Sequence, residues 1–173
     1  MSLLINAPAD VMEILELLAN QKFIKIKEED LVITLEKITD SLRIRVLAKK
    51  EIDWRTFFLQ LGAIVLEILE AFPFDRLHFS KFLVGKHHAY GDKPLMPWKE
   101  LGILIRVHSK VGRLANISSN TGVDIGDETM MDTIRDLLGY SILGFLLHER
   151  IKTQCQSQVI PSSEDVFPRL GRA

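Results

Sequence analysis

The sequence predicts an all-α protein, a helical bundle with at most one short strand pair near residues 22–27. Apolar residues recur three and four positions apart through most of the chain, which is the spacing of helix faces packed on a core. Strands do not alternate with helices in the way that parallel sheets require. With 173 residues, of which 47% are hydrophobic, the chain is long enough to bury a core without disulfides or metals.

Capping and helix-breaking residues place the helix boundaries. Pro8 and Asp10 begin the first helix, Asp53 caps a long and nearly all-apolar helix, and Pro73 ends it. Pro97 suits the first turn of a later helix, and Asp127 is expected to cap the last one. Six helices are expected. The first begins near Pro8, and the other five cover about 28–47, 54–72, 75–86, 98–117 and 127–152.

Composition narrows the classes of partner and compartment. The formal net charge is −1, so we expect no binding to a DNA or RNA duplex, which would require a basic excess or a concentrated basic face. Cys155 is the one cysteine, which rules out an intramolecular disulfide and favours a reducing cytoplasm. The most apolar stretch, 57–74, contains Glu67 and Glu70, so we expect no membrane span.

Three carboxylates on the last predicted helix form an acidic stripe. Glu128, Asp132 and Asp136 are four residues apart and fall within roughly 80° of one another on a helix. One turn later the same face becomes apolar, so carboxylates there need a cation or a basic partner. Mg²⁺ or Mn²⁺ suits such oxygen ligands. The alternative is an exposed first turn whose acids interact favourably with the helix dipole.

The preceding predicted helix carries a matching basic stripe. Arg106, Lys110 and Arg113 lie on one face and could neutralise a chain of phosphates, with the arginines as bidentate donors. Equally, these bases could only pair with the acids of the next helix. Both interpretations place the basic stripe opposite the acidic one.

An ordered set of short motifs resembles a known family over residues 79–147. The motifs are Lys86 with Tyr90-Gly91, then Gly102-Ile103, Ile105-Arg106, Lys110 and Arg113-Leu114, and finally Asp127-Glu128, Asp132-Thr133, Asp136-Leu137 and Tyr140. This set resembles the nucleotide-modification-associated domain family of phages and bacteria, a relative of the MazG-like all-α nucleoside triphosphate pyrophosphatases. Residues 75–155 would then be the nucleotide-handling region, 1–74 helices that complete the bundle without a family match, and 156–173 a loose tail.

The resemblance also implies roles for single residues. Glu67 and Glu70 have the spacing of the first acidic pair in the MazG-type signature and would join the three stripe acids as metal ligands. The alternative is that they are two acids at the solvent edge of a buried helix. Lys86, Tyr90 and Tyr140 would contact the substrate, with Tyr90 against the base. The chain departs from the family pattern in several places. The gap from Glu70 to Glu128 is longer than expected, and Glu128 and Asp132 are four residues apart where the signature has Glu-x-x-Asp. Ser109 stands where an acid is expected before Lys110, and Gly139 stands where a polar residue is expected before Tyr140.

Two functions follow as hypotheses. The first is a nucleotide-handling enzyme that uses Mg²⁺ or Mn²⁺ to hydrolyse a phosphoanhydride of a nucleoside triphosphate or modified nucleotide, with Glu128, Asp132 and Asp136 as catalytic metal ligands. The alternative is a module that binds a nucleotide or signalling nucleotide without cleaving it, or that binds a protein. We also expect a homodimer or higher homo-oligomer, because the apolar segments 54–72 and 137–147 are hard to bury in one protomer.

Overall fold

The computed structural model describes residues 4–21, 26–91, 97–119 and 129–157, apart from the side chains of Glu28 and Tyr90. Its helices are α1 (Pro8–Ala19), α2 (Leu31–Leu47), α3 (Trp54–Glu70), α4 (Arg76–Tyr90), α5 (Lys99–Ser119) and α6 (Met130–Ser157), with a 3-10 turn, η1, over Glu28–Asp30. The predicted all-α bundle is therefore confirmed. Most of the segment proposed as a strand, residues 22–25, lies outside the described residues.

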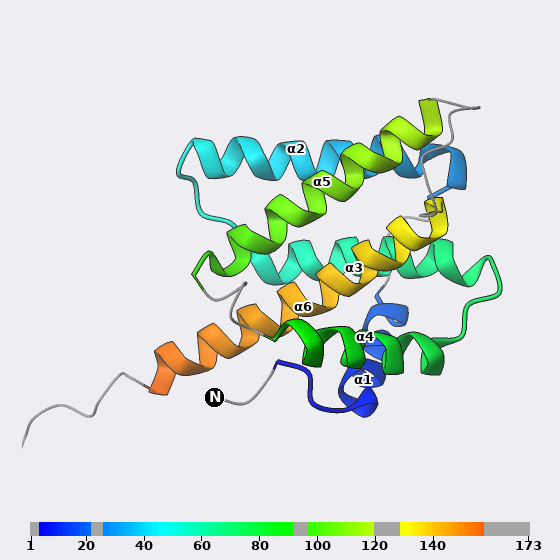
Figure 1. Cartoon of the computed structure of the whole chain (residues 1–173). Coiled ribbons are helices and arrows are strands. Elements are labelled where there is room, and N and C mark those ends of the chain that lie inside the picture. Colours follow the sequence, from blue (N-terminus) through cyan, green and yellow to red (C-terminus); the bar gives the residue numbers. More distant parts are fainter. Residues whose placement is uncertain (1–3, 22–25, 92–96, 120–128, 158–173) are drawn as a thin grey trace, which may run out of the picture.

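Helices α3 and α6 cross at the centre of the bundle. α6 packs on α3 and α5, α2 packs on α5, and α1 packs on α3 and α4. In Figure 1, α2 and α5 lie on one side of the α3–α6 pair, and α1 and α4 lie on the other. Eleven of the seventeen residues of α3 are buried, as expected for a central helix with apolar residues on nearly every side.

Small residues let the central helices approach closely. A Cβ atom at Gly144 of α6 would lie inside the van der Waals envelope of the Phe58 ring on α3. At Gly62 of α3, a Cβ would lie 2.7 Å from the Ser141 hydroxyl of α6 and 2.9 Å from Leu18 of α1. Phe58 itself is fully buried and stacks on Trp54, with 6.0 Å between ring centroids. The close crossing of α3 and α6 therefore requires glycine, which has no Cβ atom, at these two positions.

Several predicted boundaries are confirmed and others shift. The Asp53 carboxylate accepts a hydrogen bond from the Thr56 amide and caps α3, and Asp75 caps α4 through the His78 amide. α3 ends at Glu70, two residues earlier than predicted. α4 continues to Tyr90, so Tyr90 ends a helix rather than lying in a loop. α6 continues to Ser157, beyond the predicted end near residue 152 and into the segment expected to be a loose tail.

Both central helices are buried within one chain, so their apolar faces do not need a second protomer to cover them. α3 and the middle of α6 cover each other, and α1 and α5 cover much of the rest. A self-associating form would have to use another surface. The largest exposed apolar side chains on α2 are Ile33, Ile44 and Leu47.

Candidate functional site

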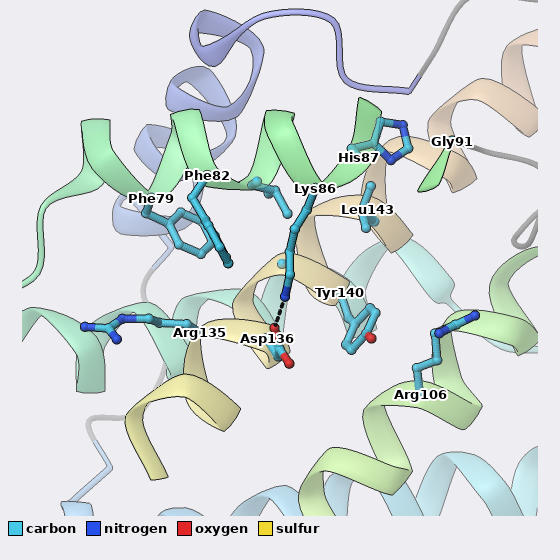
Figure 2. Close-up of a pocket in the computed structure, with 12 residues that line it drawn as sticks. Phe79, Phe82, Lys86, His87, Gly91, Arg106, Arg135, Asp136, Tyr140 and Leu143 are labelled. Atoms are coloured by element: carbon cyan, nitrogen blue, oxygen red, sulfur yellow. Dashed lines mark hydrogen bonds and ion pairs between the residues drawn. The ribbon is translucent and has the colours of Figure 1, made fainter. Parts of the chain in front are cut away.

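Asp136 is the meeting point of three helices. One of its oxygens lies 3.1 Å from the Lys86 Nζ of α4, and the other lies 2.7 Å from the Lys110 Nζ of α5. The Asp136 and Lys110 side chains are about one-fifth exposed, so their mutual attraction is less screened by water than that of a surface pair. Figure 2 shows Lys86 reaching down from α4 to Asp136 on α6. The basic stripe was predicted to lie opposite the acidic one, and the Lys110–Asp136 pair confirms this placement for these two residues.

A pocket opens beside this ion-pair cluster. It has a volume of about 390 Å³, within the size range of small-molecule sites. In Figure 2, Phe79, Phe82 and Lys86 extend from α4, Arg135, Asp136 and Tyr140 extend from α6 opposite them, and Tyr140 lies between Asp136 and Arg106. The lining residues are Phe79, Phe82, Leu83, Lys86, His87, Gly91, Arg106, Arg135, Asp136, Gly139, Tyr140 and Leu143.

The charge of this pocket favours anions. The described lining residues include three cations, Lys86, Arg106 and Arg135, and one carboxylate, Asp136. Arg135 also pairs with Asp132, which does not line this pocket. The Lys86 Nζ also lies 4.9 Å from the centroid of the Phe82 ring, within the range of a cation–π contact. Arg106 is exposed and makes no ion pair with any described residue. A ligand with an anionic group and a flat apolar body matches this arrangement.

A second pocket adjoins the first on the side of the α3–α4 connection. Its volume is about 490 Å³, and it shares Phe79, Phe82, Lys86, Arg135 and Asp136 with the first pocket. Its remaining lining residues are Pro73, Phe74, Asp75, His78 and Asp132.

Asp132 lines the second pocket, and its carboxylate also takes part in capping the N-terminus of α6. Its Oδ2 accepts hydrogen bonds from the Thr129 hydroxyl, at 2.7 Å, and from the Thr129 amide, at 3.1 Å. The Asp132 amide donates back to the Thr129 hydroxyl, which completes a capping box. The hydrogen bonds from Thr129 lower the pKa of Asp132, and the Arg135 guanidinium adds to the effect. The cap is therefore Thr129, whereas Asp127, the predicted cap, lies outside the described residues.

The proposed metal ligands are only partly brought together. Glu67 and Glu70 are exposed on α3, Glu70 pairs with Arg76, and neither lines either pocket. Glu128 lies outside the described residues. Within the described part of the chain, no three His, Cys, Asp or Glu side chains gather in a way that could hold a metal ion. Asp136 has a lysine on each oxygen, so the described donors fit a cationic side chain better than Mg²⁺ or Mn²⁺.

The predicted substrate-binding residues are also divided. Lys86, Arg106 and Tyr140 line the first pocket. Lys110 lies behind it and holds Asp136, while Arg113 is one turn further along α5 and does not line either pocket. The side chain of Tyr90 is outside the described part of the structure.

The sequence patterns did not identify the aromatic residues Phe79 and Phe82, or the cation Arg135, as pocket residues. Phe79, Phe82 and Lys86 follow one another at helical spacing on α4, a signal that was present but is shared by most amphipathic helices. Arg135 is three residues after Asp132, the spacing of a helical ion pair, and its Nη1 lies 3.0 Å from the Asp132 Oδ1.

The glycine that departs from the family pattern has a steric role. Gly139 lines the first pocket, and a Cβ there would lie 3.2 Å from a methyl carbon of Leu83 on α4. A polar side chain at this position would project into the region between α4 and α6. Because Gly139 has no side chain, this region remains part of the pocket.

Comparisons with known proteins add no relatives. No family model matches the chain, and neither the curated proteins nor the solved structures contain a match. The likeness to nucleotide-modification-associated domains thus remains an expectation from the sequence motifs. None of the helices in the described residues is both long enough and apolar enough to cross a membrane.

Proposed function

We propose that the first pocket binds a nucleotide through its phosphates and that binding requires no resident metal ion. The observation that carries this proposal is the placement of Lys86, Arg106 and Arg135 around an aromatic-walled pocket with one carboxylate. Arginine and lysine donate charge-assisted hydrogen bonds to phosphate oxygens. Phe82 and Tyr140 offer ring surfaces on which a base can pack.

In this proposal Asp136 is an internal counter-ion. It pairs with both Lys86 and Lys110, and it repels an incoming phosphate. Replacing it with the isosteric Asn removes that repulsion and leaves both ammonium groups available. The Asp136→Asn variant should therefore bind nucleotides about fivefold more tightly, equivalent to roughly 1 kcal/mol for one partly screened charge.

Calorimetry with ATP, ADP and AMP in the presence of EDTA tests this proposal directly. Lys86→Gln and Arg106→Gln should weaken binding, whereas Lys81→Gln, an exposed lysine of α4 outside both pockets, should leave it unchanged. Binding should also weaken as salt is added. Weaker nucleotide binding by Asp136→Asn in EDTA would contradict the role given to this carboxylate.

Metal-dependent hydrolysis at the same site is the second candidate. Asp132 and Asp136 are one helical turn apart and both line the second pocket, which favours this alternative. In such an enzyme the metal would polarise phosphoryl oxygens and activate water. Product release should then be measured with canonical and modified nucleotides plus Mg²⁺ or Mn²⁺. Turnover that is unchanged in the Asp132→Ala, Asp136→Ala double variant would contradict this mechanism.

We further propose, from the resemblance to MazG-like proteins, that the chain self-associates. The exposed apolar residues of α2 (Ile33, Ile44 and Leu47) are the surface that supports this proposal. Light scattering over a range of concentrations tests it. A mass that stays at 19.7 kDa as the concentration rises would refute it.

A further inference from the structure

The two pockets meet along a single ridge. The five residues that they share come from neighbouring turns of α4 and α6, so the two pockets adjoin along these side chains. On this ridge Lys86 and Arg135 supply two positive charges and Asp136 supplies one negative charge. Lys86 pairs with Asp136, and Arg135 pairs with Asp132 of the second pocket. Each pocket separately has a volume within the range of roughly 300–1,000 Å³ that small-molecule sites show.

The second pocket has its own aromatic wall. Phe74, from the α3–α4 connection, packs against Phe79 with 5.5 Å between the ring centroids, and both residues line this pocket. The exposed His78 imidazole adds another flat ring at the same pocket. A base can therefore pack on rings on each side of the charged ridge.

The second pocket also contains hydrogen-bond acceptors that the first lacks. Asp75 and Asp132 line only the second pocket. One Asp75 oxygen caps α4 through the His78 amide, and the other accepts no hydrogen bond from a described residue. A carboxylate is a suitable acceptor for the hydroxyls of a ribose, as in the dinucleotide sites of Rossmann folds.

We propose that the ligand is a dinucleotide, in which two nucleosides are joined through phosphates. The phosphates lie on the ridge of Lys86 and Arg135, one base packs in the first pocket, and the second nucleoside fills the second pocket with its sugar against Asp75. This inference rests on the proposed nucleotide binding and specifies the class of nucleotide.

The probes are diadenosine diphosphate and ADP, titrated calorimetrically in EDTA. Diadenosine diphosphate should bind at least roughly tenfold more tightly than ADP, which is the gain expected from stacking one additional base. In the Asp75→Asn, His78→Ala double variant this preference should disappear, while ADP affinity should stay unchanged. Asn retains the ability to cap α4, and His78 is exposed, so the double variant should fold. Lys81→Ala is the matched control on α4.

The possible failures are distinguishable. If the wild-type chain binds ADP but binds diadenosine diphosphate no more tightly, the dinucleotide assignment is wrong and nucleotide binding stands. Equal weakening of both ligands in the double variant would also overturn the assignment, because it would indicate one shared site. If neither ligand binds, the proposed function itself is wrong.

Discussion

Replacing Gly144 with alanine should destabilise the bundle through a single steric conflict. The new Cβ would overlap the Phe58 ring, which is fully buried between Trp54 and Phe57 and has little space to move. Inserting a methyl group into a packed core usually costs about 1–3 kcal/mol. The higher helix propensity of alanine returns only about 0.5–1 kcal/mol of this. A net loss of about 1–2 kcal/mol is expected, which lowers the Tm by roughly 2–8 °C at this chain length.

Gly112→Ala is the matched control. Gly112 lies within α5, and a Cβ there would meet no atom within 4 Å. This variant should be stabilised by the same propensity term, about 0.5–1 kcal/mol. Urea unfolding followed by circular dichroism measures both variants, and adding Phe58→Leu to Gly144→Ala should recover part of the loss. A Gly144→Ala protein as stable as Gly112→Ala would refute the close approach of α3 and α6.

Three further measurements test other parts of the structure. The hydrogen bonds from Thr56 lower the pKa of Asp53, and those from Thr129 lower the pKa of Asp132. The two carboxylates should therefore stabilise the fold fully above the unfolded pKa near 4. This stabilisation should be lost as the pH falls through the lower pKa values of the folded state. The Asp53→Asn, Asp132→Asn double variant should show a weaker acid dependence of unfolding than wild type, and an equally steep one would count against these caps. His148 Nδ1 lies 2.9 Å from the buried Glu100 carboxylate, so His148→Ala should cost about 1–3 kcal/mol in thermal unfolding, because Glu100 loses its partner. Adding Glu100→Gln should recover part of that cost, and no recovery would contradict the pairing.

The sequence predicts the helices well because local chemistry determines them. Asp53 caps α3 in the structure as the sequence indicated, and the apolar character of this helix predicted its central position. The end of α4 was missed because His87, His88 and Ala89 do not stop a helix. Tyr90 and Gly91 look like a loop, but it is Gly91, with a φ of 67°, that ends the helix.

The site was harder to predict because it depends on how distant segments meet. Helical spacing placed Asp132 and Asp136 on one stripe but could not show that one closes a capping box while the other holds two lysines. Thr129 and Asp132 have the spacing of that box, so this part of the signal was readable from the sequence. The contribution of Phe82 and Arg135 depends on the packing of α4 beside α6, which no single helix pattern encodes.

The central position of α3 has a practical consequence for dissecting this protein. Every lining residue of the first pocket lies between 79 and 143, yet the helix that supports α6 from behind ends at Glu70. A fragment starting at residue 75 would carry the whole lining of the first pocket but lose α3, the partner of its longest helix, and so expose to water the apolar residues of α6 that pack on α3. Such a fragment should aggregate rather than bind. Substitutions deep in α3 should for the same reason alter ligand affinity without touching the ligand.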